Sequence, residues 1–120
     1  SENGALAIVP FSNQIVRTVT ALILEKKIPL TPFWNLSDLR ILVENKKNKI
    51  LIYERLGKES VDTFIKQTEF INYKKNIIDF DIEMKKGSMI IFDELCVHRG
   101  SAPKKNDRLV LRYLFRKKLN

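Results

Sequence analysis

The apolar residues of this 120-residue chain occur in short runs, and none approaches the roughly 18 residues that a membrane-spanning helix requires. The most apolar windows, residues 50–53 and 89–92, have the length of strands. With 44% hydrophobic residues, a chain of this size can bury one modest core. We therefore expect a single soluble domain over residues 1–120 that does not enter a membrane.

Several of these runs favour strands. Residues 5–9 are compact, apolar and partly β-branched, which favours a strand over a helix. Residues 39–44 and 49–55 are two strand-like runs, and the polar connection 45–48, with Asn at both ends, predicts a β-hairpin between them.

Towards the end of the chain, residues 77–84, 88–92 and 108–115 are further predicted strands, and a tight loop at 93–97 follows the second of them. Six or so short strands with little helix predict an antiparallel sandwich or barrel.

The middle of the chain is less regular. Residues 14–27 have apolar positions at helical spacing but many β-branched residues, so that a helix and a strand both remain open. The proline-containing stretch that follows predicts a loop in which Phe33 and Trp34 are apolar anchors. Ser60 is a plausible N-cap for a short helix that ends near Asn72.

The net charge of +8 would attract a polyanion, and exposed aromatic residues can stack on bases. The lysine pairs, however, lie mostly where turns are expected, so a basic module that binds nucleic acid is an alternative and not the favoured interpretation. Cys96 is the only cysteine, which fits a reducing, cytoplasmic location. The start at Ser1, without Met or a leader pattern, predicts a processed, tagged or truncated beginning.

His98 is the only histidine, so one copy of the chain cannot build a metal site with two imidazoles. Cys96 lies two residues away, but a Cys/His nucleophile pair would need a third orienting group that the sequence does not offer. We expect Cys96 to be a small buried residue. Asp93 and Glu94 could be imagined as a carboxylate ligand, but their position at a strand exit favours turn formation or ion pairs.

Two blocks of sequence resemble the phytanoyl-CoA dioxygenase family. Residues 86–93 (KGSMIIFD), 98–101 (HRGS) and 108–113 (RLVLRY) are similar to the C-terminal end of that family. Residues 2–12, with an Asn-Gly turn, a strand and a Pro-x-Ser loop, are similar to an earlier segment. The stretch 15–76 resembles nothing that we can name.

The resemblance implies an antiparallel, partial double-stranded β-helix of jelly-roll or cupin type with one or two short helices. It also implies an oxygenase that uses iron(II) and 2-oxoglutarate to hydroxylate a small molecule. By the same resemblance, His98 would be the distal iron ligand and Arg108 would bind the 2-oxoglutarate carboxylate, since a guanidinium can hold it in a bidentate manner. Ser101 is a possible helper, and Arg112, four residues along the same strand, competes with Arg108 for the carboxylate.

The family's His-x-Asp or His-x-Glu pair is absent from the 120 residues. We therefore expect that the sequence starts partway through the domain, that this chain alone is inactive, and that His98 by itself binds iron weakly. A partial β-helix exposes strand edges, which predicts a homo-oligomer. A structural β domain that has lost the chemistry is the remaining alternative, and the sequence does not identify the substrate.

Overall fold

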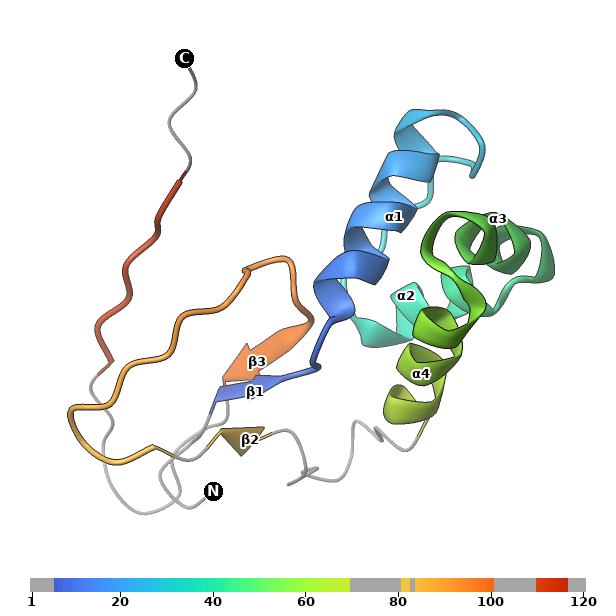
Figure 1. The fold of residues 1–120 in the computed structure, drawn as a ribbon. Helices are drawn as coiled ribbons and strands as arrows, with labels where there is room; N and C mark the ends of the chain where they lie inside the picture. Colours follow the sequence, from blue (N-terminus) through green and yellow to red (C-terminus); the bar gives the residue numbers. More distant parts are fainter. Residues whose placement is uncertain (1–5, 70–80, 83, 101–109, 117–120) are drawn as a thin grey trace.

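The structure, a computed structural model, describes residues 6–69, 81–82, 84–100 and 110–116. Within these residues a group of helices lies beside a small sheet, and extended segments run on the far side of the sheet from the helices (Figure 1). The elements in chain order are β1 (Leu6–Ile8), α1 (Ser12–Leu24), α2 (Leu36–Glu44), α3 (Lys46–Leu56), α4 (Lys58–Thr68), β2 (Asp81–Ile82) and β3 (His98–Gly100). None of the described helices has the length and apolar character to cross a membrane.

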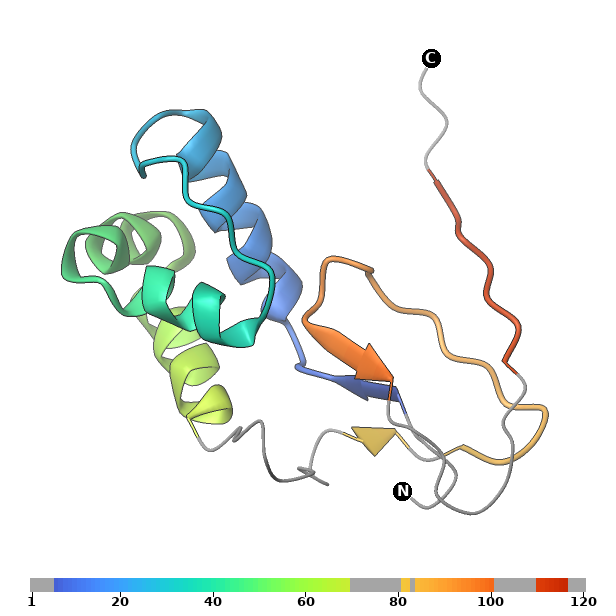
Figure 2. The ribbon, with the colours of Figure 1, turned by 180° about the vertical axis from the view of Figure 1, so that it is seen from behind.

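The sheet has the strand order β2-β1-β3, and both pairings are antiparallel. The central strand β1 pairs Leu6 with Ile82 on one side and with Gly100 on the other, while Ile8 lies opposite His98. Seen from behind, β1 leads directly into α1, so the sheet and the helices are joined by a very short connection (Figure 2). The strand that carries His98 therefore lies beside the first described residues of the chain.

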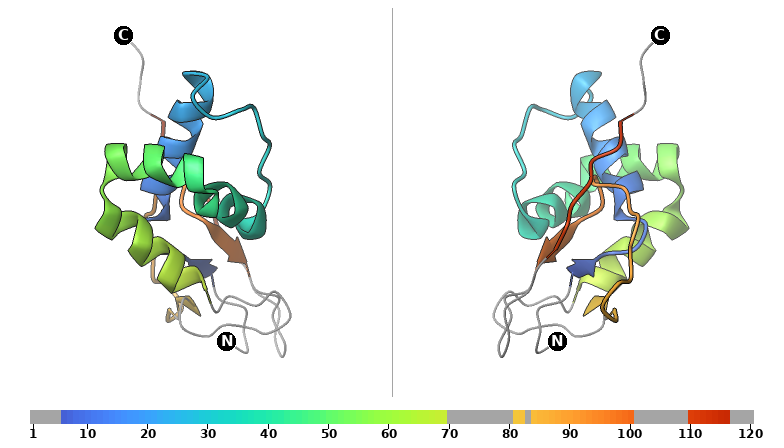
Figure 3. Two further views of the ribbon diagram at one scale, coloured as in Figure 1. Left: turned by 90° about the vertical axis from the view of Figure 1, so that its right-hand side faces the viewer. Right: turned by 90° about the vertical axis from the view of Figure 1, so that its left-hand side faces the viewer.

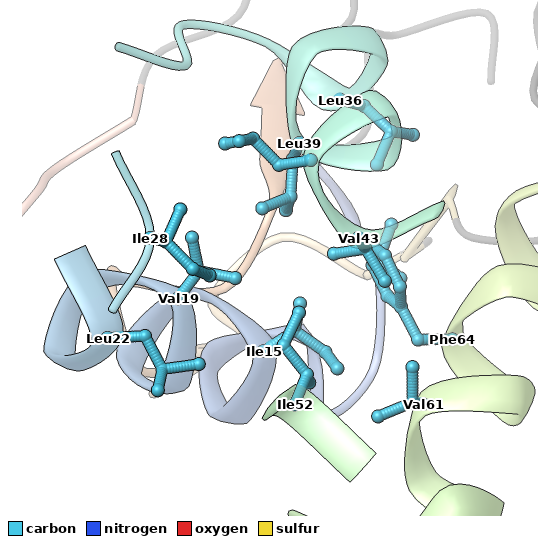
Figure 4. Close-up of a cluster of buried hydrophobic side chains, with 12 residues drawn as sticks. Ile15, Val19, Leu22, Ile28, Leu36, Leu39, Val43, Ile52, Val61 and Phe64 are labelled. Atoms are coloured by element: carbon cyan, nitrogen blue, oxygen red, sulfur yellow. The ribbon is translucent and has the colours of Figure 1, made fainter. Parts of the chain in front are cut away.

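The helices surround one apolar core (Figure 4). In α1, Ile15, Val19 and Leu22 are buried at the i, i+4, i+7 spacing of one helix face. α3 packs against α1, α2 and α4, and it contributes Ile52, whose side chain is 0% exposed. Val9, immediately after β1, belongs to the same core, so the sheet and the helices share it.

The prediction of a mainly β fold is wrong, because the described residues contain four helices and only three short strands. The predicted hairpin over residues 39–55 is in fact the helix pair α2 and α3. Asn45 lies at their junction, where its side-chain oxygen accepts hydrogen bonds from the backbone N–H groups of Lys47 and Asn48 and caps α3. The Asn that suggested a hairpin turn is a helix N-cap.

Two other segments, for which the sequence allowed or predicted a helix, are helical in the structure. The open choice for residues 14–27 is resolved as the helix α1, in which the hydroxyl of Thr18 donates to the Gln14 carbonyl one turn earlier. The predicted helix beginning at Ser60 is confirmed as α4, but its N-cap is Gly57 and it begins at Lys58. Ser60 lies inside the first turn.

Of the predicted strands, some are confirmed and others are wrong. The strand at residues 5–9 is confirmed as β1, whereas only residues 81–82 of the predicted strand 77–84 are assigned to a strand and most of the others lie outside the described residues. Residues 88–92 and 110–116 belong to no strand. Residues 110–116 are all exposed, and they form an extended segment that lies apart from the helices, on the other side of the sheet (Figures 1 and 2). A strand is assigned by its hydrogen-bonded neighbour, and no such neighbour exists for these segments within the described part of the chain.

The loop between α1 and α2 runs along the outside of the helices (Figure 3). The expectation that Phe33 and Trp34 are both apolar anchors holds for Phe33, which packs against the core. It is wrong for Trp34, which is 88% exposed.

Candidate functional site

The segment that leads into β3 is bound to the start of α1. The buried hydroxyl of Ser12 accepts a hydrogen bond from the Val97 N–H and donates one to the Val9 carbonyl, both at 2.7 Å. The Val9 N–H in turn donates to the Val97 carbonyl at 2.9 Å. These three bonds fix the residue before His98 onto the Pro-x-Ser loop.

Residues 93–96, which we call the Asp93 turn, form a second attachment to α1. The Asp93 carbonyl accepts from the Cys96 N–H at 2.9 Å, and one carboxylate oxygen accepts from the Leu95 N–H at 3.0 Å, as Asp commonly does in turns. The other carboxylate oxygen accepts from the Asn13 amide at 3.1 Å and from the Arg17 guanidinium at 2.7 Å. The carboxylate therefore joins the turn to two residues of α1.

These contacts lower the pKa of the Asp93 carboxyl below its ordinary value. The largest cause is the backbone N–H of Leu95, followed by the Asn13 amide, and the Arg17 charge adds to them while desolvation opposes them. A lowered pKa in the folded state means that the ionised carboxylate stabilises the fold.

A pH dependence follows. The stabilisation from Asp93 is complete above the ordinary aspartate pKa and is lost as the pH falls through the lower pKa of the folded state. We expect the Tm of the wild type to exceed that of Asp93→Asn by a constant margin above about pH 5, and the margin to shrink as the solution is acidified further. Thermal unfolding at a series of pH values measures this. A margin that does not change with pH would contradict the assignment.

His98 is the first residue of β3, and its side chain is exposed. Its Nδ1 lies 2.7 Å from the Cys96 carbonyl oxygen. Because a carbonyl oxygen only accepts hydrogen bonds, Nδ1 must carry the hydrogen, which leaves the lone pair of the neutral ring on Nε2. The Phe92 ring and the imidazole also meet in a T-shaped arrangement, with 5.4 Å between the ring centroids and 65° between the planes. The imidazole thus has a defined tautomer and a neighbour that orients it.

The structure brings one of the other proposed site residues close to the Asp93 turn. Arg112 forms an ion pair with Glu94, the second residue of that turn. Its guanidinium is therefore near the segment that carries His98, but it already has a carboxylate partner. Ser101 and Arg108 lie outside the described residues.

The expectations for the carboxylates and the thiol near His98 are confirmed in part. Asp93 forms the turn and an ion pair with Arg17, and Glu94 forms an ion pair with Arg112, as expected, although the preceding residues 88–92 form no strand. Cys96 is half-buried and not fully enclosed. Within the described ranges, no three His, Cys, Asp or Glu side chains gather closely enough to hold a metal ion.

The residues on α1 that hold the Asp93 turn were not found from the sequence. Ser12 was noted only as part of the Pro-x-Ser pattern, and nothing marked Asn13 and Arg17. Their spacing, four residues apart on one helix face, would have been a signal only if α1 had been recognised as a helix.

A groove of about 290 Å³ lies between the start of α1 and the helix α4. At its edge Phe11 has a φ of 60°, a left-handed conformation that is uncommon for a residue with a side chain. The groove is lined by both polar and apolar side chains, those of Pro10, Phe11, Gln14, Leu56, Glu59, Ser60, Thr63, Phe64 and Gln67. It contains no histidine and no basic side chain.

Comparison of the chain with protein-family models, with curated proteins and with solved structures gave no match.

Proposed function

We propose that this chain is the C-terminal part of an iron(II)- and 2-oxoglutarate-dependent oxygenase that hydroxylates a small molecule, with His98 as one iron ligand. The carboxylate of 2-oxoglutarate would be bound by Arg108, with Ser101 as a helper. Arg112 is the alternative arginine, and it would have to leave Glu94 to take this role. The cytoplasm, where iron(II) stays reduced and Cys96 stays a thiol, suits this chemistry.

The observation that carries the proposal is the meeting of the two sequence blocks that resemble the oxygenase family. One block supplies β1 and Ser12, and the other supplies β3, which Val97 immediately precedes, so that the two are separated by most of the chain. They nevertheless pair as strands, with Ile8 opposite His98, and they share the hydrogen bonds of Ser12.

The geometry of His98 supports the same role. Histidine ligands commonly donate one ring N–H to a backbone carbonyl, which orients the ring and leaves the other nitrogen to bind the metal. His98 has this arrangement with the Cys96 carbonyl, and its ring is exposed. When bound, the iron would supply the site at which dioxygen and 2-oxoglutarate react.

The second histidine ligand must come from another polypeptide segment, because the 120 residues contain no further histidine. Exposed apolar side chains in the extended segments offer such a segment a surface, and a second copy of the chain is one candidate for it. The most exposed of these side chains are Met89, Ile91, Leu111, Tyr113 and Phe115.

A basic module that binds nucleic acid is less well supported. Four arginines in the described part of the chain form ion pairs with carboxylates, which reduces the positive charge they present to a phosphate backbone. These are Arg17, Arg40, Arg55 and Arg112.

The proposal is tested by adding iron(II) without oxygen to the ¹⁵N-labelled chain and following the paramagnetic broadening of its NMR signals. We expect weak binding that broadens the imidazole of His98 first, because one ligand of three is present. Adding 2-oxoglutarate should strengthen the broadening, since the keto acid is itself a bidentate ligand and gains a charged partner on the protein.

The control variants separate the two parts of the site. His98→Ala should abolish the local broadening, and Arg108→Ala should remove only the gain from 2-oxoglutarate. Arg112→Ala is the matched variant for the competing arginine. Broadening that is unchanged in His98→Ala, or centred on another part of the chain, would refute the proposed function.

A further inference from the structure

The Asp93 turn connects α1 to the imidazole of His98 through an unbroken series of hydrogen bonds. Arg17 and Asn13 hold one oxygen of the Asp93 carboxylate, and the other oxygen accepts from the Leu95 N–H. The turn is closed by the bond from the Cys96 N–H to the Asp93 carbonyl. The carbonyl of Cys96, the last residue of this turn, is the group to which the ring of His98 is bonded.

We infer that Asp93, held by Arg17 of α1, is a positioning residue that fixes the tautomer of His98 so that Nε2 faces outward as the ligand atom. This inference rests on the proposed role of His98 and adds to it the part of the chain that controls the ligand. Neutral imidazole in water exchanges between its two tautomers, and the partner of one nitrogen decides which form is present. The partner here is the Cys96 carbonyl, whose direction is set by the turn.

The position of Arg17 on α1 explains how the helical core is linked to the orientation of His98. Asn13 and Arg17 are four residues apart and therefore lie on the same side of α1, which is the side that meets the turn. The opposite side of α1 carries the core residues Ile15, Val19 and Leu22. A shift of α1 within the helical core would consequently move the Asp93 carboxylate and, through the turn, the carbonyl that orients His98.

The single histidine makes the test direct. In the ¹⁵N-labelled, metal-free chain at alkaline pH, two-bond ¹H–¹⁵N correlations of the imidazole report the tautomer without ambiguity, because no other histidine contributes. The wild type should show mainly the Nδ1–H form. Asp93→Ala should change the tautomer ratio by about fivefold or more towards Nε2–H, which corresponds to the loss of one hydrogen bond.

Variants of Arg17 separate positioning from a general loss of structure. Arg17→Gln, at an exposed side chain, should shift the ratio in the same direction by a smaller factor, and Arg17→Lys should restore most of the wild-type ratio. Arg55→Gln is the matched control, because it removes another exposed arginine–carboxylate pair, with Glu25, that does not touch the turn. Circular dichroism of each variant checks that the helices are retained.

Two results would overturn the inference: a wild-type ring in the Nε2–H form, or a tautomer ratio that is the same in the wild type, Asp93→Ala and Arg17→Gln. If the tautomer ratio changed in Asp93→Ala but not in Arg17→Gln, the role of α1 in orienting His98 would be refuted. The measurement contains no metal, so its failure is distinct from that of the proposed function. If His98 bound no iron, the tautomer result would still stand.

Discussion

Replacing Ile52 with alanine should lower the free energy of unfolding by about 2–5 kcal/mol, the range for removing a large aliphatic side chain from a packed core. Ile52 is 0% exposed, and it is the buried residue of α3, the helix that packs against the other three. The space left by its side chain would lie between four helices that are held in place by one another, so the core can close around it only in part. Urea unfolding followed by circular dichroism measures the loss.

Ile50 is the matched control, because the same substitution in the same helix removes a side chain that is 59% exposed. Ile50→Ala should change the stability by no more than about 0.5 kcal/mol, and the higher helix propensity of alanine favours the smaller effect. The comparison also tests the fold. Two residues apart, these side chains share a face of a strand but lie about 200° apart around a helix. Equal effects of the two substitutions would contradict the helix α3.

The second large effect is expected at Ser12. Ser12→Ala should cost about 1–3 kcal/mol, because it leaves the Val97 N–H without an acceptor, whereas the Val9 carbonyl keeps the backbone N–H of residue 12 as a donor at 3.3 Å. The substitution removes only one oxygen atom, so that the cost comes from the lost hydrogen bonds and not from packing. The Val97 amide should also exchange with deuterium faster, because its hydrogen-bond acceptor is gone.

Ser60→Ala is the control for this change, since Ser60 is an exposed serine in the first turn of α4. It should leave both the stability and the exchange of Val97 close to those of the wild type. A Val97 amide that is equally protected in Ser12→Ala would show that the Pro-x-Ser loop does not hold the segment before His98.

An element could be predicted from the sequence where the residues that determine it are close together in the chain. The strand β1 and the helix α4 follow from runs of neighbouring residues, and both were expected. The hairpin at residues 39–55 was wrong because short apolar runs suit a strand and a helix alike. Leu39, Leu42 and Val43 have helical spacing, and together with Leu36 they are the residues that α2 buries. The two Asn residues decided the interpretation, although Asn serves turns and helix N-caps equally.

The sequence singled out a candidate site residue but not the residues that hold it in place. The chain has one histidine, so His98 could be singled out from the sequence. Its partners depend on long-range contacts, since Arg17 and Asp93 are far apart in the chain and meet only after α1 has packed. Asp93 itself was expected to form a turn or an ion pair, and it does both.

The connection between β1 and β3 also bears on the order in which the molecule folds. The helices contact one another over shorter sequence separations, since all four lie within residues 12–68, whereas β1 and β3 must find each other across almost the whole chain. Closing such a long loop is entropically costly and slow compared with helix formation. We therefore expect the helical core to assemble first, with the histidine-bearing strand docking onto it in a late step of folding.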